Sequence, residues 1–245
     1  MRFAGKVAIV TGGGSGIGLA TSKLFQREGG RVVILERDEA KAHQAAEELE
    51  SPDGPAALGL RCDVSCESDV AASVDATLEH FGRFDIIVNC AGVMIFKPLH
   101  EQTLADWRRV LDVDLLGAFY FTKQAFLRMS HGGSIVNVSS IHAIETTPLV
   151  SAYAAAKAAL LSFTRSAQLE GKARNIRVNA VLPGAVDTPM LWENPNVTSG
   201  LEHIDRGMVG SADSVAEVIA FLASPEAEFV CGASLIADGG RLGKL

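Results

Sequence analysis

The sequence predicts a single α/β domain of the doubly wound class, in which helices cover both faces of a seven-stranded, mostly parallel sheet. Seven short runs rich in Val and Ile are apolar throughout rather than at alternate positions, which is typical of strands buried on both faces. Amphipathic stretches separate most of these runs, so strand and helix alternate along the chain. The length of 245 residues fits one domain over residues 1–245.

In chain order, the predicted strands are residues 6–10, 31–35, 57–62, 85–89, 134–139, 177–182 and 234–237. Stretches with apolar residues at helical spacing predict helices at residues 17–28, 39–49, 67–80, 104–129, 152–170 and 212–223. Residues 185–210 interrupt the alternation, because they hold two Pro, three Gly and only weak periodicity. An irregular segment of this length inside a compact domain is typical of a substrate-binding loop.

Charge and apolar runs limit the partners and the location of the protein. A net charge of −7 at pH 7 opposes binding to nucleic acid, which requires a basic face. No apolar run reaches the roughly 18–20 residues that span a bilayer, and the N-terminus lacks the features of a signal peptide. We therefore expect a cytoplasmic protein that binds a small molecule and no membrane. The four cysteines lack zinc-site spacing, so we expect no metal and no disulfide.

A glycine-rich loop follows the first predicted strand and leads into the first helix. Its sequence is TGGGSGIG, residues 11–18, and glycine lets a backbone turn tightly and approach a pyrophosphate at the helix N-terminus. The spacing is G-x3-G-x-G and no Gly-Lys-Ser/Thr follows, which excludes the loop of a kinase or NTPase. The loop predicts a dinucleotide site built on Gly12, Ser15, Gly16, Ile17 and Gly18.

An acidic residue at the end of the second predicted strand indicates which dinucleotide binds. Glu36 lies twenty residues after Gly16, where a carboxylate can accept hydrogen bonds from both ribose hydroxyls and repel a 2′-phosphate. Arg37 favours a phosphate, but no basic residue inside the glycine loop assists it. An acid at a strand end is also common on protein surfaces. Weighing these, we expect NAD rather than NADP as the cofactor.

Five motifs occur along the chain in a characteristic order: TG-x3-G-x-G at 11–18, NCAG at 89–92, VSS at 138–140, Y-x3-K at 153–157 and PG at 183–184. With them the chain resembles the ordinary-length branch of the short-chain dehydrogenase/reductase family, from about residue 4 to ADGG at 237–240. The resemblance implies a Rossmann-type fold and an NAD(P)-dependent enzyme that interconverts a secondary alcohol and its ketone by hydride transfer. Likeness to the family's glucose and polyol dehydrogenases makes a sugar, polyol or cyclic alcohol the expected substrate.

The resemblance also implies that Tyr153 is the catalytic acid and base, with Lys157 one helical turn away. A free phenol has a pKa of about 10, and the Lys157 ammonium together with a positive nicotinamide ring should lower that value. Tyr153 can then take the proton of an alcohol or return it to a ketone, while Lys157 also binds the nicotinamide ribose. These two residues alone would also fit a packed Tyr beside a Lys that extends to solvent; the other motifs favour catalysis.

Two further catalytic positions follow from the resemblance. Ser140 is expected to hold the substrate oxygen, and Ser139 beside it is the structural alternative. Asp114 stands where the family usually has an asparagine that helps to hold a proton-relaying water, largely through its backbone carbonyl at a helix kink. We expect Asp114 to leave activity intact with a shifted pH optimum, although a carboxylate near Lys157 would weaken the effect of that lysine on Tyr153.

Further positions match the cofactor-binding segments of the family: Asp63, Val64, Asn89, Ala91, Gly92, Pro183, Gly184, Val186 and Thr188. Asp63 is expected at the adenine amino group, and the segment from Pro183 to Thr188 at the nicotinamide amide. For Asn89, a purely structural role explains the residue equally well.

The substrate residues are expected after Ser140, after the NCAG turn and in the irregular segment: Met94, Ser140, His142, Glu145 and Trp192, with Phe96 beside them. His142 and Glu145 together indicate a polyhydroxy substrate. Met94, Phe96 and Trp192 would equally line a pocket for a cyclic or acyl ketone.

Two helical stretches indicate self-association. Residues 117–129 and 152–170 are apolar nearly all round, which a helix covered on one face by a sheet does not need. We expect them to form the interface of a homo-oligomer, a dimer or a homotetramer.

Two alternatives stay open beside an NAD-dependent alcohol dehydrogenase. An NADPH-dependent 3-oxoacyl-carrier-protein reductase needs a basic docking patch, for which KARNIR at 172–177 is the modest candidate, and Glu36 opposes it. A non-catalytic NAD-sensing protein would be indicated by loss of the catalytic residues, but Ser140, Tyr153 and Lys157 are all present.

Overall fold

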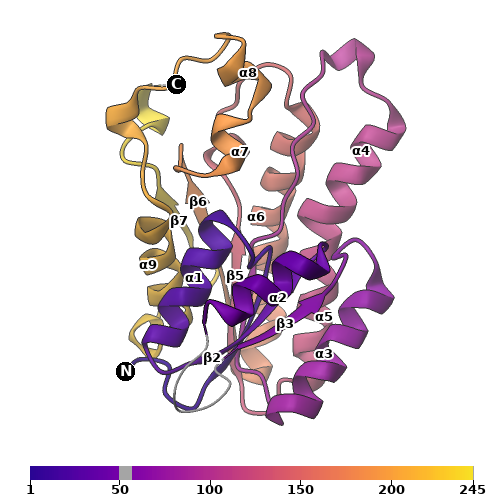
Figure 1. The fold of residues 1–245 in the computed structure, drawn as a ribbon, viewed down its shortest axis with the longest axis vertical. Helices are drawn as coiled ribbons and strands as arrows, with labels where there is room; N and C mark the ends of the chain where they lie inside the picture. The colour runs from indigo at the N-terminus through magenta and orange to yellow at the C-terminus, as the bar shows by residue number, and fades with distance from the viewer. Residues whose placement is uncertain (50–56, 245) are drawn as a thin grey trace.

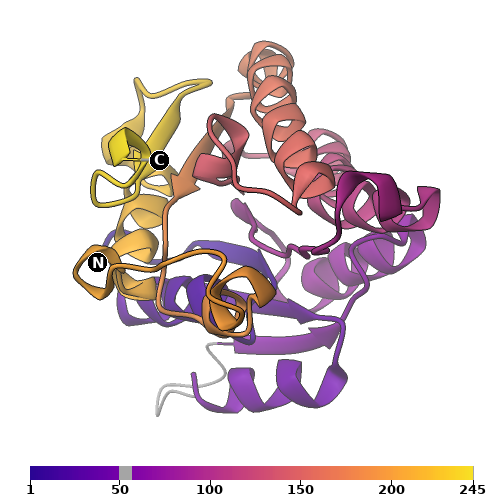
Figure 2. The same cartoon turned by 90° about the horizontal axis from the view of Figure 1, so that it is seen from above.

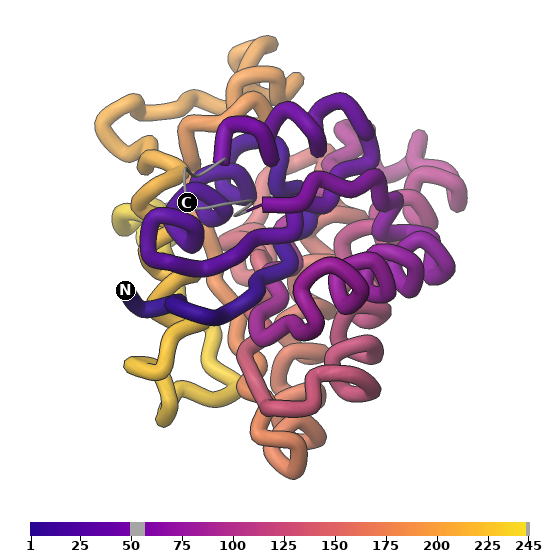
Figure 3. Tube along the Cα trace, turned by 60° about the horizontal axis from the view of Figure 1, so that its bottom comes forward, coloured from indigo at the N-terminus to yellow at the C-terminus, as the bar shows by residue number. Residues whose placement is uncertain are grey.

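The computed structural model describes residues 1–49 and 57–244, and it confirms the doubly wound α/β class. The sheet has seven strands in the order β3-β2-β1-β4-β5-β6-β7, and every pairing in it is parallel. The strands are β1 Val7–Thr11, β2 Arg31–Glu36, β3 Ala57–Arg61, β4 Ile86–Asn89, β5 Gly133–Val138, β6 Ile176–Pro183 and β7 Ser234–Ala237. Figure 3 traces the chain from the indigo N-terminal segments to the yellow C-terminal ones.

Helices cover both faces of the sheet, as predicted (Figures 1 and 2). The longer helices are α1 Gly16–Arg27, α2 Glu39–Glu47, α3 Glu67–Phe81, α4 Leu104–Leu111, α5 Gly117–Arg128, α6 Ser151–Gly171 and α9 Ala212–Ala223. Apart from the helix predicted at 104–129, the predicted bounds of these elements differ from the observed ones by at most two residues. None of the helices in residues 1–49 and 57–244 is long and apolar enough to cross a membrane.

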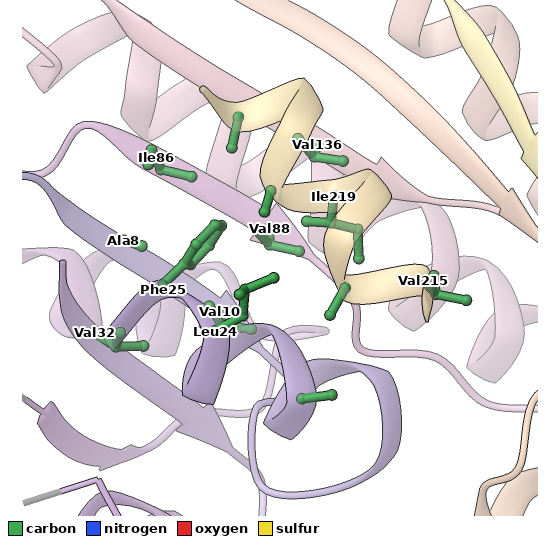
Figure 4. Close-up of a cluster of buried hydrophobic side chains, with 14 of the residues drawn as sticks. Ala8, Val10, Leu24, Phe25, Val32, Ile86, Val88, Val136, Val215 and Ile219 are labelled. Carbon is green, nitrogen blue, oxygen red and sulfur yellow. The ribbon is translucent and has the colours of Figure 1, made fainter. Parts of the chain in front are cut away.

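Alternate residues of each strand enter two separate cores. On one face, Val10 of β1 and Val32 of β2 pack with Phe25 of α1 and Ile219 of α9, all of them buried (Figure 4). On the other face, Ile9 of β1 belongs to the core formed with α3, α5 and α6. Strands buried on both faces must be apolar at every position, which is why their sequence pattern does not alternate.

The helix predicted at 104–129 is wrong as one regular element. The structure divides it into α4, a π-helical turn at Asp112–Leu116, and α5. The wider turn brings the buried Asp114 against the loop after β4, where its Oδ2 accepts a hydrogen bond from the backbone N–H of Val93 at 3.0 Å. The apolar spacing of the sequence continues through this turn, so the pattern carries no sign of it.

The irregular segment 185–210 lies over the carboxyl ends of the strands, at the end of the molecule where the chain also terminates (Figure 1). It contains two short helices, α7 Pro189–Trp192 and α8 Pro195–Thr198. Its two ends are joined by an isolated parallel bridge between Val186 and Gly210. Seen from above, the segment passes over the N-terminal end of α1 (Figure 2), where a Cβ at Gly16 would come within 3.0 Å of the Thr188 side chain.

Candidate active site

A cavity of about 360 Å³ opens along the carboxyl ends of the strands. The sheet order changes direction between β1 and β4, and ligands of open α/β sheets bind at such a point. The structure brings most of the predicted residues to its lining: Gly12, Ser15, Ile17, Gly18, Glu36, Asp63, Val64, Ala91, Gly92, Met94, Ser140, His142, Tyr153, Lys157, Pro183, Gly184, Val186 and Thr188. Six predicted residues do not line it: Gly16, Asn89, Phe96, Asp114, Glu145 and Trp192.

The glycine loop has the shape of a cradle that side chains would fill. Gly12 has a φ of +62°, and a Cβ there would lie 3.0 Å from the Ala91 Cα. A Cβ at Gly18 would lie 2.1 Å from the Gly12 carbonyl oxygen. The Ser15 side chain does not cap α1, so first-turn N–H groups of this helix stay available for an anion. The residues therefore fit the pyrophosphate of a dinucleotide.

Two carboxylates hold defined positions on the same side of the cavity. Glu36 Oε1 accepts a hydrogen bond from the Gly14 backbone N–H at 3.0 Å. Asp63 Oδ1 accepts from the Ser65 N–H at 3.0 Å and from the Ser65 hydroxyl at 2.6 Å. Burial acts to raise the pKa of Asp63, but the bonds from Ser65 and the charge of Arg109 outweigh it and lower the pKa. Asp63 is therefore an anion at neutral pH.

Tyr153, Lys157 and Ser140 converge where β5 ends beside α6. All three side chains are buried, and Lys157 Nζ donates to the Val138 carbonyl oxygen at 3.0 Å while lying 5.4 Å from the Tyr153 ring centroid. Ser139 points elsewhere, because its hydroxyl donates to the Lys157 carbonyl oxygen at 2.9 Å. Both serines and Tyr153 line the cavity, but the Ser139 hydroxyl is already engaged in fastening α6 to β5.

The expected lowering of the Tyr153 pKa is not found in the protein by itself. Burial raises the pKa of Tyr153, and although Lys157 acts in the opposite direction, the negative charge of Asp114 adds to the increase. The prediction considered Lys157 and a positive nicotinamide ring, and it gave too little weight to desolvation of the phenolate.

The Asp114 side chain lies directly against Lys157, the lysine that the family resemblance assigns to catalysis. Its Oδ1 is 3.0 Å from Lys157 Nζ, and both side chains are almost fully buried. Burial acts to lower the pKa of Lys157, but the Asp114 carboxylate outweighs it and raises the pKa, so the lysine keeps its proton. The contact that the sequence analysis considered for a carboxylate near Lys157 is therefore formed, beside the backbone carbonyl that the family resemblance indicated.

Asn89 lies behind the cavity. Its side-chain amide donates to Asn137 Oδ1 at 2.8 Å, and Asn137 in turn donates to Thr164 Oγ1 at 2.9 Å. This buried chain ties β4 to β5 and α6, which corresponds to the structural alternative for Asn89.

The predicted substrate residues separate into two groups. Met94 and His142 line the cavity, and the His142 ring lies 5.8 Å from that of Tyr153. Burial, assisted by the charge of Arg241, lowers the pKa of His142 to about 4, so its imidazole is neutral at neutral pH. Glu145 follows the turn after β5 and points into solvent, outside the lining. The structure therefore does not form the expected polar pair of His142 and Glu145.

Trp192 and Phe96 also lie outside the cavity lining. The Trp192 indole N–H donates to Asp187 Oδ1 at 2.6 Å, and the Arg206 guanidinium stacks on its ring at 4.7 Å. Phe96 packs with the apolar cluster around Val110 on α4. Both aromatic residues are held by other contacts, which the sequence pattern did not indicate.

Several lining residues were not predicted from the sequence: Met190, Leu191, Asn194, Glu202 and Arg241. Arg241 donates to Glu202 Oε1 at 2.5 Å, and both side chains are 13% exposed. The irregularity of segment 185–210 was the available signal for the first four residues. Arg241 comes from the chain after β7, for which the sequence offered no signal.

The fold and the site define a dinucleotide-dependent oxidoreductase, and comparison with known proteins places the chain in a family. A family profile described as "Enoyl-(Acyl carrier protein) reductase" matches residues 12–241. The chain is 44% identical to cis-4-hydroxycyclohexanecarboxylate dehydrogenase of Sinomonas cyclohexanicum, over 97% of both chains. It is 39% identical to 3beta-hydroxysteroid dehydrogenase 1 of Eggerthella lenta, over 96% of this chain and 93% of the relative. Cyclopentanol dehydrogenase of Comamonas sp. is 35% identical over 98% of both chains.

The chain belongs to the short-chain dehydrogenase/reductase family, as its motifs indicated. It is an enzyme, an NAD(P)-dependent oxidoreductase that acts on CH–OH groups. The three relatives are named as dehydrogenases of a hydroxycyclohexanecarboxylate, a hydroxysteroid and cyclopentanol.

Proposed function

We propose that this protein is an NAD-dependent dehydrogenase that interconverts a cyclic secondary alcohol and its ketone. The observation that carries the proposal is the meeting of Ser140, Tyr153 and Lys157 with five apolar side chains in the lining of the same cavity. These are Val93, Met94, Ile141, Met190 and Leu191, and the lining also holds His142, Asn194 and the Glu202–Arg241 pair. An apolar pocket with a few placed polar groups suits a ring that bears one hydroxyl.

Each of the three polar residues has its own role in the transfer of the substrate proton. The Ser140 hydroxyl holds the substrate oxygen by a hydrogen bond, next to Tyr153. Tyr153 Oη takes the hydroxyl proton when the alcohol is oxidised and gives it back when the ketone is reduced. The Lys157 ammonium, fixed by Val138 and Asp114, stabilises the phenolate that forms during oxidation. When bound, the nicotinamide cofactor accepts or supplies the hydride.

The choice of NAD over NADP rests on Glu36. Its carboxylate lines the cavity at the end of β2 and is oriented by the Gly14 N–H. In this position it can accept hydrogen bonds from the ribose hydroxyls and would repel a 2′-phosphate. Arg37 lines the cavity as well but stands beside this carboxylate. Asp63 is the residue we propose for the adenine.

A cyclic alcohol is favoured over a sugar or polyol because the predicted polar pair does not form. Glu145 lies outside the cavity, and His142 is a neutral imidazole within it. The printed names of the relatives point the same way, because they refer to a cyclohexane ring, a steroid and cyclopentanol.

The test is a substrate panel in which formation of the reduced nicotinamide is followed by absorbance. The panel holds cyclopentanol, cyclohexanol, cis-4-hydroxycyclohexanecarboxylate, a 3β-hydroxysteroid, sorbitol and glucose, each with NAD and with NADP. We expect turnover of cyclic alcohols with NAD, lost in Tyr153→Phe. Turnover of only sorbitol or glucose would overturn the substrate class, and turnover only with NADP would overturn the cofactor assignment.

We also propose that the protein is a homo-oligomer, a dimer or a tetramer, built through α5 and α6. Phe119, Leu127 and Leu169 on these helices are between 41% and 81% exposed, and apolar side chains of this size are favoured at subunit interfaces. Light scattering coupled to size-exclusion chromatography measures the mass directly. A monomer at micromolar concentration would contradict this proposal.

A further inference from the structure

We propose that Asp114 is a positioning residue that holds the Lys157 ammonium in a buried ion pair and so keeps Tyr153 protonated to more alkaline pH. The proposal rests on the proposed role of Tyr153 and adds a function for a carboxylate at this position. It concerns the charge of the side chain, because an asparagine would occupy the same volume without that charge.

The geometry fixes the carboxylate from both sides. Asp114 stands on the π-helical turn between α4 and α5, where its Oδ2 accepts from the Val93 N–H at 3.0 Å and its Oδ1 lies 3.0 Å from Lys157 Nζ. Lys157 Nζ is held in turn by the Val138 carbonyl oxygen at 3.0 Å. A Cβ at Gly92 would come within 2.8 Å of Asp114 Oδ1 and 3.5 Å of Lys157 Nζ, so this glycine lets the backbone pack against the pair.

The contact between Asp114 and Lys157 is mainly one of charge. Asp114 Oδ1 makes no aligned hydrogen bond to any residue in the part of the chain that the structure describes, although it lies at ion-pair distance from the ammonium. Coulomb attraction between two buried charges is strong and depends on their distance rather than on the angle between them. Replacing Asp114 by asparagine therefore removes most of the interaction while the acceptor for the Val93 N–H is kept.

The other ionisable groups around the pair do not supply a second negative charge. Cys90, on the loop after β4, has its pKa raised to about 12 by burial and is a neutral thiol. His142, after β5, is a neutral imidazole with a pKa lowered to about 4. Arg109 on α4 is a cation and acts on Asp114 from a distance, while its Nη1 lies 3.9 Å from Asp63 Oδ2. Burial raises the pKa of Asp114 itself, whereas the charge of Lys157 and the Val93 N–H act in the opposite direction. The contact of Asp114 Oδ1 with Lys157 Nζ at 3.0 Å favours the ionised pair.

This charge changes the pH range in which each direction of the reaction runs. The Lys157 ammonium favours the Tyr153 phenolate, and the Asp114 carboxylate offsets part of that effect. Tyr153 therefore stays a phenol, the form that donates a proton to a ketone, to higher pH. Oxidation of an alcohol, which needs the phenolate, is shifted to alkaline pH by the same amount.

The first experiment titrates Tyr153 in the protein without substrate or cofactor. The chain has two tyrosines, so in a Tyr120→Phe background the ultraviolet absorbance of the phenolate reports Tyr153 alone. We expect Asp114→Asn to move the titration midpoint to lower pH by roughly one unit or more. The matched control is Asp112→Asn, which removes the same charge from the same π-helical turn and should leave the midpoint unchanged. An unchanged or higher midpoint in Asp114→Asn would overturn the proposal.

The second experiment measures the pH dependence of kcat in both directions with the best substrate of the panel. In Asp114→Asn, the pH of half-maximal oxidation and the alkaline limit of reduction should both move to lower pH, and KM for the alcohol should change little. A uniform loss of kcat at every pH would indicate a structural role only. If Asp114→Asn does not fold, Asp114→Ser removes the same charge with a smaller side chain. Failure of the whole substrate panel would overturn the proposed function, whereas the tyrosine titration would still decide this inference.

Discussion

The two ends of the cavity are built from different parts of the chain. At the nucleotide end, the surface is backbone and strand-end residues, with Gly12 and Gly18 after β1 and Glu36 closing β2. At the substrate end, it comes from segment 185–210 and from the chain after β7, which the Arg241–Glu202 ion pair joins. The sheet fixes the nucleotide end. Contacts between segment 185–210 and the chain after β7 fix the substrate end. Changes at the substrate end should therefore alter specificity without affecting dinucleotide binding.

We expect the largest effect on activity from a substitution of Tyr153, which lies where the nucleotide end and the substrate end of the cavity meet. Tyr153→Phe removes only the Oη, so we expect kcat to fall roughly 10²–10⁴-fold. Dinucleotide affinity should stay near that of the parent, because the buried ring is retained. Steady-state kinetics and the fluorescence of bound NADH measure the two quantities. A variant that keeps most of its turnover would contradict the role of Tyr153.

The second prediction concerns a substitution that should disrupt the nucleotide end alone. A Cβ at Gly18 would lie 2.1 Å from the Gly12 carbonyl oxygen, so Gly18→Ala must displace the loop. We expect a loss of about 1–3 kcal/mol in the free energy of unfolding, together with weaker NAD binding. Gly243→Ala is the control, because a Cβ there meets nothing within 4 Å. Normal NAD affinity in Gly18→Ala would show that the loop does not form the phosphate cradle.

The third prediction uses pH to test the substrate end. The pKa of His142 is lowered to about 4 in the folded protein, against about 6.5 in an unfolded chain. The unfolded state therefore binds more protons between these values, and stability should decrease as the pH falls from about 6.5 toward about 4, by about 1–3 kcal/mol. Denaturant unfolding at several pH values measures this loss.

His142→Gln supplies the comparison for that measurement. Glutamine does not titrate, so this part of the pH dependence should disappear in the variant while the rest remains. An identical slope in parent and variant would mean that His142 is protonated in the folded protein.

The smallest expected effect concerns the ion pair between Glu202 and Arg241. Glu202→Gln leaves the Arg241 guanidinium without its negative partner, so an anionic substrate should bind better. We expect KM for cis-4-hydroxycyclohexanecarboxylate to fall roughly fivefold, corresponding to about 1 kcal/mol, and KM for cyclopentanol to change within about twofold. Glu193→Gln, an exposed acid of the same segment, is the control. Equal changes for both substrates would indicate that Arg241 does not face the bound ring.

Most residues that the sequence assigned to the nucleotide end lie together in the cavity because their positions depend on local features. Apolar runs fix the strands, and Gly12, Gly18 and Glu36 follow directly where strands end. The substrate end depends on contacts between distant residues: Arg241 meets a partner 39 residues away, and Trp192 is turned away by Asp187 and Arg206. No periodicity or local motif encodes such pairings.

The sequence predicted that Ser140, Tyr153 and Lys157 lie together, but it did not predict the electrostatics around them. Tyr153, Lys157 and Ser140 follow from motif spacing, whereas the contact of Asp114 with Lys157 depends on the π-helical turn at 112–116. That turn leaves the apolar pattern of the helix unchanged, so the side chain's direction was not predictable. The raised pKa of Tyr153 has the same origin, since burial is a property of the folded protein.

The bridge between Val186 and Gly210 has a consequence for the design of new specificities. The Asp187 N–H donates to the Gly210 carbonyl at 2.9 Å, and the Gly210 N–H donates to the Ala185 carbonyl at 2.9 Å. These hydrogen bonds hold the beginning and the end of segment 185–210 side by side. The residues between them form a cassette with fixed attachment points. Such a cassette can be transplanted between relatives, carrying its ligand preference with it, while the recipient scaffold keeps its hydrogen bonds.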